Sequence, residues 1–191
     1  MRTRQTHSPT KEKLLDAARE LMLSKGFDAT TVDEICEAAN FTKGSFFHYF
    51  KSKEDLGKAV LDRFVSARYQ AIQSAPFSKS RDPLKRVYGY LDFVIKMSKE
   101  PSERKGCLLG SFAQDLSETH PEIRKSCAHH FTSWAKLIKR DLDRAKAKYA
   151  PKARLDTSSL AEHFIAVFEG SIILAKSNQD PEVVEKNLRH F

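Results

Sequence analysis

Residues 41–50 read FTKGSFFHYF, in which phenylalanine, tyrosine and histidine follow a short polar opening. Soluble proteins normally bury this many aromatic side chains, yet Lys43 lies within the stretch and Lys51 and Lys53 follow it. Thr42 is a good N-cap, and the positions behind it fit a short helix over about 43–49. Phe46 and Phe50 lie four positions apart, so one face of this helix can be buried while the other stays outside.

The segment before this helix predicts a partner helix over 32–39. Thr31 and Glu34 have the spacing of a capping box, and a longer first helix over 10–25 precedes them. Two short helices joined by a tight turn are typical of a helix-turn-helix, whose second helix enters the DNA major groove. An ordinary amphipathic hairpin with every aromatic in its core fits the pattern equally well, so periodicity leaves both interpretations open.

On the helix-turn-helix interpretation, the exposed side of the second helix meets the bases. Phe47 can touch a thymine methyl, and Lys43 and His48 can reach base edges. The Tyr49 hydroxyl and the Lys53 ammonium suit phosphates, as do the free N–H groups at helix starts. The predicted DNA-binding residues are Thr31, Thr42, Lys43, Gly44, Ser45, Phe47, His48, Tyr49 and Lys53.

Composition is that of a folded protein, with 40% hydrophobic and 30% charged residues and a net charge of +8. The charge suits a polyanionic partner but does not show one, because residues 1–60 hold ten Lys and Arg against nine Asp and Glu. The three cysteines are widely spaced, and no metal, cofactor or catalytic pattern is visible, so an enzyme is not expected. A polar N-terminus and no stretch judged long enough to span a bilayer favour the cytoplasm.

The rest of the chain predicts an all-α fold of about nine helices, punctuated by prolines. The expected division is a DNA-binding domain over 1–56 and a larger helical domain over 57–191, joined by a continuous fourth helix. The expected helices lie at 10–25, 32–39, 43–49, 52–75, 82–99, 107–117, 121–148, 156–178 and 181–190.

Residues 10–56 resemble the DNA-binding domain of TetR-family transcriptional regulators. The matching stretches are TKEKLLDAARELMLSKGFDATTVDEICEAAN and FTKGSFFHYFKSKEDL. The second is close to the most diagnostic run of the family, although Phe41-Thr42 and Phe46-Phe47 replace the common valine-serine and leucine-tyrosine pairs. Losing the tyrosine hydroxyl at Phe47 removes one polar contact, which implies a different operator.

This resemblance implies a homodimer on a palindromic operator, with recognition helices about 34–36 Å apart. It also implies a C-terminal domain with a dimer interface and a ligand pocket, where an effector favours release of the DNA. Repression is expected on family grounds. A helical protein-interaction module is a rival class, and it would show no salt-dependent affinity for DNA.

Residues 106–124, GCLLGSFAQDLSETHPEIR, resemble a TetR branch that regulates efflux and responses to electrophiles. Cys107 should lie in the first turn of a helix, after Arg104 and Lys105, where the dipole and the cations lower a thiol's pKa. Cys107 is therefore a candidate redox sensor, with Lys176 expected nearby. A buried thiol that serves only as a small hydrophobic residue is the alternative.

Two further sets of residues come from apolar helix faces and the family layout. Each pocket candidate also fits plain core, but together they indicate a small apolar or electrophilic effector. They are Phe64, Tyr88, Leu91, Ile95, Cys107, Phe112, Phe131 and Trp134. The helix over 156–178 is apolar on more than one side and needs a second partner, which the family supplies as a dimer bundle of the last two helices. Its predicted interface is Phe164, Val167, Phe168, Ser171 and Ile172.

Overall fold

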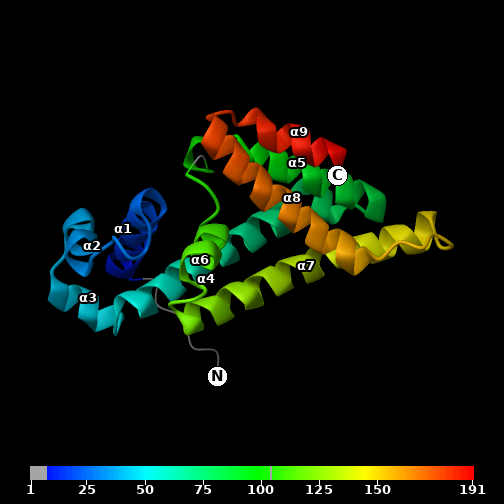
Figure 1. The fold of residues 1–191 in the computed structure, drawn as a ribbon. Helices are drawn as coiled ribbons and strands as arrows, with labels where there is room; N and C mark the ends of the chain where they lie inside the picture. The colour runs from blue at the N-terminus through cyan, green and yellow to red at the C-terminus, as the bar shows by residue number, and fades with distance from the viewer. Residues whose placement is uncertain (1–7, 104) are drawn as a thin grey trace, which may run out of the picture.

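The computed structural model describes residues 8–103 and 105–191, and over these ranges it holds nine α-helices and no strand. This confirms the all-α prediction. Three helices form a head at one end of the molecule, at the blue end of the colour scale in Figure 1. They are α1 (Pro9–Lys25), α2 (Val32–Ala39) and α3 (Lys43–Tyr49).

Side-chain caps fix the starts of α2 and α3. Thr31 Oγ1 accepts a hydrogen bond from the Glu34 N–H at 3.2 Å, and the Glu34 carboxylate accepts one from the Thr31 N–H at 2.9 Å. This is the capping box that the sequence indicates. Asn40 ends α2 with a φ of 58°, and this left-handed residue turns the chain sharply toward α3.

α4 (Lys53–Ser74) begins in the head and continues into the larger body of the molecule (Figure 1). Ser52 caps it, with Oγ accepting from the Asp55 N–H at 3.1 Å. The body is completed by five more α-helices and by two short 3₁₀ segments that the sequence did not indicate. These are η1 (Pro76–Lys79), α5 (Pro83–Ser98), η2 (Pro101–Glu103), α6 (Leu108–Leu116), α7 (Pro121–Tyr149), α8 (Thr157–Asn178) and α9 (Glu182–His190).

The buried core does not divide where the chain leaves the head. Phe112 and Leu116 of α6 and Ile123 of α7 belong to the same buried cluster as Leu14 and Ile35 of the head. A second cluster fills the rest of the body between α5, α7, α8 and α9. The head therefore shares part of its hydrophobic stabilisation with α6 and α7, so a shift of α6 changes the surface on which the head rests.

Among the described helices, α8 is long and apolar enough to cross a bilayer by length and composition. The expectation that no stretch reaches that length is wrong for this helix. Phe164 and Phe168 of α8 are 1% and 5% exposed and pack in the core of the body. One such helix is weak evidence for a membrane span, since core helices of soluble proteins share these properties.

Candidate functional site

The third helix presents one aromatic face to the core and one to solvent. Phe46 is fully buried and Phe50 is 3% exposed, whereas Phe47 is 56% exposed. Thr42 caps the helix by accepting a hydrogen bond from the Ser45 N–H at 3.2 Å. The crowded stretch therefore contains both core and surface residues, since the Phe47 ring touches Phe46 edge-on with centroids 5.1 Å apart but keeps more than half of its surface exposed.

Polar groups surround Phe47 on the same surface. Lys43 forms an ion pair with Asp33 of α2 at 2.8 Å, and both side chains are more than half exposed. The exposed His48 ring lies edge-on to Tyr49, with ring centroids 4.7 Å apart. Exposed ion pairs contribute little to stability, so the Lys43 ammonium can exchange Asp33 for another anion.

The two side chains expected on phosphates are bonded within the head. The Tyr49 hydroxyl lies 2.7 Å from Ser8 Oγ. Lys53 Nζ donates to the carbonyl oxygens of Phe27 at 2.9 Å and of Asp28 at 3.2 Å. Lys53 therefore stabilises the turn after α1. If its ammonium also contacts a phosphate, it must do so while it is bonded to that turn.

Gly44 stands in open space. A Cβ atom built on it meets only Thr42 Oγ1, at an ordinary 3.6 Å, and its φ is not positive. Neither packing nor backbone conformation requires a glycine here. Thr31 and Thr42 are exposed, and Ser45 is half-buried.

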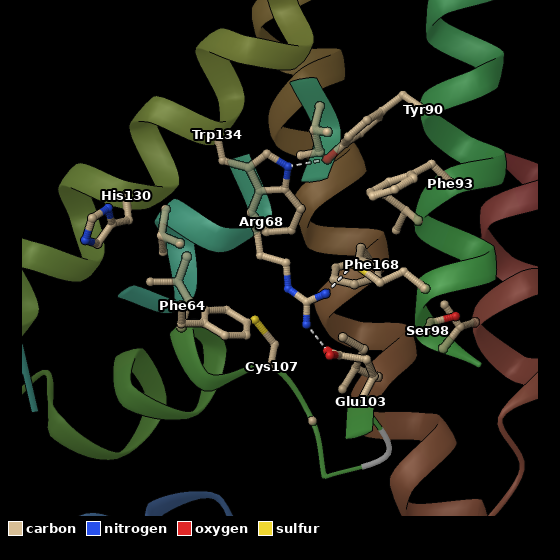
Figure 2. A pocket seen from close by; sticks show the side chains of 18 of the residues that line it. Phe64, Arg68, Tyr90, Phe93, Ser98, Glu103, Cys107, His130, Trp134 and Phe168 are labelled. Carbon is tan, nitrogen blue, oxygen red and sulfur yellow. Dashed lines mark hydrogen bonds and ion pairs between the residues drawn. The ribbon is translucent and has the colours of Figure 1, made fainter. Parts of the chain in front are cut away.

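A cavity of about 340 Å³ lies in the body next to α4. Figure 2 shows aromatic side chains turned toward it, among them Phe64, Tyr90, Phe93, Trp134 and Phe168, together with the charged Arg68 and Glu103. Trp134 Nε1 donates a hydrogen bond to the Tyr90 hydroxyl at 2.6 Å across one wall. The lining includes Phe64, Arg68, Tyr90, Phe93, Met97, Glu103, Cys107, His130, Trp134, Phe168, Ile172 and Lys176.

Three of the predicted pocket residues line this cavity: Phe64, Cys107 and Trp134. Leu91 lines a second cavity of about 330 Å³ instead. Ile95 and Phe112 are buried in the core, and neither borders either cavity.

The prediction is wrong for Tyr88, which is 61% exposed. Two positions further along α5, Tyr90 is the tyrosine that faces inward, because 200° of helical rotation separates them. Phe131 also borders neither cavity and instead stacks on Trp134 with ring centroids 6.3 Å apart.

The pocket residues predicted from the sequence did not include the charged residues of the cavity wall. Arg68 of α4 forms an ion pair with Glu103 of η2, and its guanidinium lies over the Phe64 ring at 4.9 Å (Figure 2). A signal was present, because Phe64, Arg68 and Ile72 recur every four residues and place an arginine within an apolar stripe. Such an arginine needs a buried partner or a ligand.

Cys107 precedes α6 as its N-cap residue, rather than lying in its first turn. It borders the cavity, as does Lys176, while Arg104 lies outside the described residues. The expected lowering of its pKa is wrong. Burial raises the pKa of the thiol well above its usual value, and the charge of Glu169 adds to this, although the amides of Gly110 and Leu109 act in the opposite direction.

Glu169 of α8 is a second titratable group that the sequence did not single out. Burial raises the pKa of its carboxyl to about 7, and the Cys107 thiol interacts with it. Its Oε1 is buried without a hydrogen-bond partner among the described residues. A Cβ on Gly110 would collide with the Glu169 carboxylate, so α6 and α8 meet closely at this point.

Comparison with known proteins identifies the fold and the function of the head. Residues 14–60 match the bacterial regulatory proteins of the tetR family, and residues 83–191 match the tetracyclin repressor-like C-terminal domain. The chain belongs to the TetR family. It is therefore a DNA-binding transcriptional regulator rather than an enzyme, and TetR-family regulators act on operator DNA as dimers.

Several relatives span nearly the whole chain. The transcriptional repressor DhaR of Mycobacterium sp. strain GP1 is 28% identical over 95% of this chain and 89% of its own. The repressor NemR of Escherichia coli is 24% identical over 97% of this chain and 93% of its own. A crystal structure of regulatory protein TetR from Rhodobacter sphaeroides superposes with a TM-score of 0.85, at 27% identity over 96% and 97% of the two chains.

In this TetR-family chain, the expected dimer residues of α8 point mostly into their own subunit. Phe164, Phe168 and Ser171 are buried, Val167 is half-buried and Ile172 borders the cavity. The face of α8 that remains exposed carries Ile173 and Leu174, which are 49% and 50% exposed. A Cβ on Gly170 meets nothing within 4 Å, so this side is open. The expected face is therefore a core face.

Proposed function

We propose that this protein is a repressor that binds a palindromic operator as a homodimer and releases it when a small molecule enters the 340 Å³ cavity. The observation that carries the proposal is the division of α3, where Phe46 is fully buried and Phe47 is 56% exposed beside Lys43 and His48. A helix held rigidly by its inner face and aromatic and basic on its outer face suits the major groove.

The proposed contacts fall into two classes. Lys43, Phe47 and His48 lie on the exposed side of α3 and read base edges and thymine methyls. The phosphate contacts come from helix starts and from the flanking hydroxyls and ammonium. They are Thr31, Thr42, Gly44, Ser45, Tyr49 and Lys53.

The cavity is coupled to the head by shared elements. α4 carries Phe64 and Arg68 in the cavity wall, and its first turn packs in the head. A ligand that binds the released arrangement better than the DNA-bound one shifts the population by that difference in affinity. Because α6 belongs to the core cluster of the head, movement at the cavity changes the spacing of two heads in a dimer.

Modification of Cys107 is a second route to release. Its thiol borders the cavity beside Lys176, so alkylation or oxidation would add bulk and polarity where the effector binds. Because the thiolate is the reactive form, the raised pKa of Cys107 slows its reaction with electrophiles and oxidants unless a nearby base removes the proton.

The dimer is proposed to form through α8 and α9, with the exposed side of α8 at its centre. Ile173 and Leu174 supply apolar area, and Gly170 allows close approach of the partner helix. This replaces the face that the sequence indicated. The proposed compartment is the cytoplasm, where operator DNA and metabolites are both accessible.

Fluorescence anisotropy with DNA from the intergenic region upstream of the gene tests the function. Tight binding that weakens steeply with salt is expected, because several phosphates are neutralised. Adding an oxidant or electrophile should then release the DNA from the wild type and not from Cys107→Ser. Absence of salt-dependent binding to this DNA and to a random-sequence pool would favour the interaction-module alternative.

A further inference from the structure

We propose that the effector carries a carboxylate on an apolar body, and that the carboxylate binds the guanidinium of Arg68. This inference rests on the proposed function, since it names the chemical class of molecule that the cavity accepts. It replaces the purely apolar effector that the sequence indicated.

One nitrogen of the Arg68 guanidinium, Nη1, has only a weak hydrogen-bond acceptor inside the cavity. Its Nη2 pairs with Glu103 (Figure 2), whereas its Nη1 donates to the thioether sulfur of Met97. A thioether is a weak acceptor, and an arginine fork matches the two oxygens of a carboxylate. A ligand carboxylate that replaces the Met97 sulfur at Nη1 would convert the weakest contact of this guanidinium into a charge-assisted one.

The charges around the cavity favour a monoanion. Arg68 is balanced by Glu103, and His130 pairs with Asp62 at 2.8 Å. Lys176 also borders the cavity, and its ammonium has no ion-pair partner among the described residues. One positive charge is therefore left over on the wall, and a carboxylate placed between Arg68 and Lys176 would balance it.

The rest of the cavity wall indicates the chemical nature of the apolar part of the effector. Phe64, Phe93, Trp134 and Phe168 turn aromatic surfaces toward the same space as Arg68 (Figure 2). Such a wall suits a phenyl or similar apolar group, and the burial of that group drives binding while the carboxylate fixes its orientation.

The same carboxylate would act on the segment that joins the cavity to the head. Glu103 holds η2 against α4 through Arg68, and two residues later Lys105 pairs with Glu20 of α1 at 2.6 Å. A second carboxylate on Arg68 competes with Glu103 and repels it. Loosening η2 frees the segment that leads into Cys107 and α6, so the charge of the ligand contributes to release as well as to affinity.

Trp134 is the only tryptophan of the chain, and it borders the cavity, so its fluorescence reports binding directly. We would titrate the full-length protein with 3-phenylpropanoate and with 3-phenylpropan-1-ol, which differ in the charged group and share the phenyl body. The acid is expected to bind about tenfold tighter or more, the range for a hydrogen bond to a charged group. Equal affinities, or no quenching by the acid into the millimolar range, would overturn the proposal.

Two variants make the test specific to Arg68. Arg68→Met should abolish the preference for the acid and leave the alcohol unchanged. Glu103→Gln should have the opposite effect and tighten the acid, because the competing carboxylate is gone, and a folding defect cannot produce that gain. A preference that survives Arg68→Met, or an acid that binds Glu103→Gln more weakly, would contradict the assignment. Anisotropy with operator DNA measures DNA binding separately from ligand binding. If the samples failed to bind DNA, the proposed function would be refuted, but the measured preference for the acid would still stand.

Discussion

The Phe27 ring, in the turn after α1, lies edge-on to the Phe112 ring of α6, with centroids 5.7 Å apart and planes at 79°. The imidazole of His120, which precedes α7, also lies edge-on to the Phe27 ring, with centroids 5.1 Å apart. The Lys53 ammonium lies 4.5 Å from the centroid of the Phe27 ring. One aromatic side chain of the head therefore touches α4, α6 and the start of α7. A displacement of α6 changes the support of the head at this residue.

Replacing Phe112 should loosen this junction. Phe112→Ala removes a 2%-exposed ring from the core, which typically lowers the free energy of unfolding by about 3–5 kcal/mol. Urea unfolding measures it, and Tyr88→Ala, an exposed aromatic of α5, is the control expected to change stability by less than about 0.5 kcal/mol. If Phe112→Ala were as stable as the control, the shared core of head and body would be wrong.

Gly44→Ala should separate stability from DNA binding. Alanine favours a helix over glycine by about 1 kcal/mol, and its Cβ enters open space here, so the variant should be as stable as the wild type or more so. Operator affinity should fall, since the methyl group prevents close approach of the α3 N-terminus to a phosphate. Thermal unfolding and anisotropy check the two effects. Unchanged affinity would remove Gly44 from the interface.

Glu169 should make stability depend on pH. Burial raises the pKa of its carboxyl from 4.5 to about 7, so the fold prefers the protonated form. The resulting stabilisation is complete below about pH 4.5 and is lost as pH rises through about 7. Glu169→Gln should therefore raise the free energy of unfolding at pH 8 by about 2–3 kcal/mol, with little change at pH 4.5. A gain that is equal at both pH values would exclude titration of this carboxyl as its cause.

The same variant tests the reactivity of Cys107. The charge of Glu169 raises the pKa of the thiol, so Glu169→Gln should speed alkylation of Cys107 by iodoacetamide at pH 8. Peptide mass spectrometry resolves Cys107 from the buried Cys36 and Cys127, with Cys107→Ser as the blank. Slower alkylation would instead mean that Glu169 accepts the thiol proton.

Ile173→Asp should disrupt the dimer. Ile173 is 49% exposed in the single chain, so aspartate there should not disturb the fold but would bury a charge in the proposed interface. Sedimentation velocity at micromolar concentration is expected to show monomers. Leu155→Asp, in the loop before α8 with 40% exposure, is the matched control and should stay dimeric. A dimeric Ile173→Asp would place the interface elsewhere.

Much of the head could be predicted because its signals are local. The Thr31–Glu34 capping box and the Thr42 cap each involve residues three positions apart, and both are present. The four-residue spacing of Phe46 and Phe50 likewise predicts two buried rings on one helix.

The body was harder to predict because its helices have apolar residues on several sides. On α8, Phe164 and Phe168 are a plausible interface by pattern, yet they face the core while Ile173 faces out. On α5, Tyr88 and Tyr90 differ only in rotational phase, and packing against α7 selects Tyr90.

The sequence by itself determined the positions of the α-helices and the side-chain caps of α2 and α3, because hydrogen bonds and turns between neighbouring residues encode them. Only the tertiary structure decided which apolar face meets which partner, that Arg68 meets Glu103 across 35 positions, and that burial rather than the helix dipole controls the pKa of Cys107. Those outcomes depend on the direction in which distant helices pack. Desolvation and ion pairing are set by that packing and not by the local order of residues.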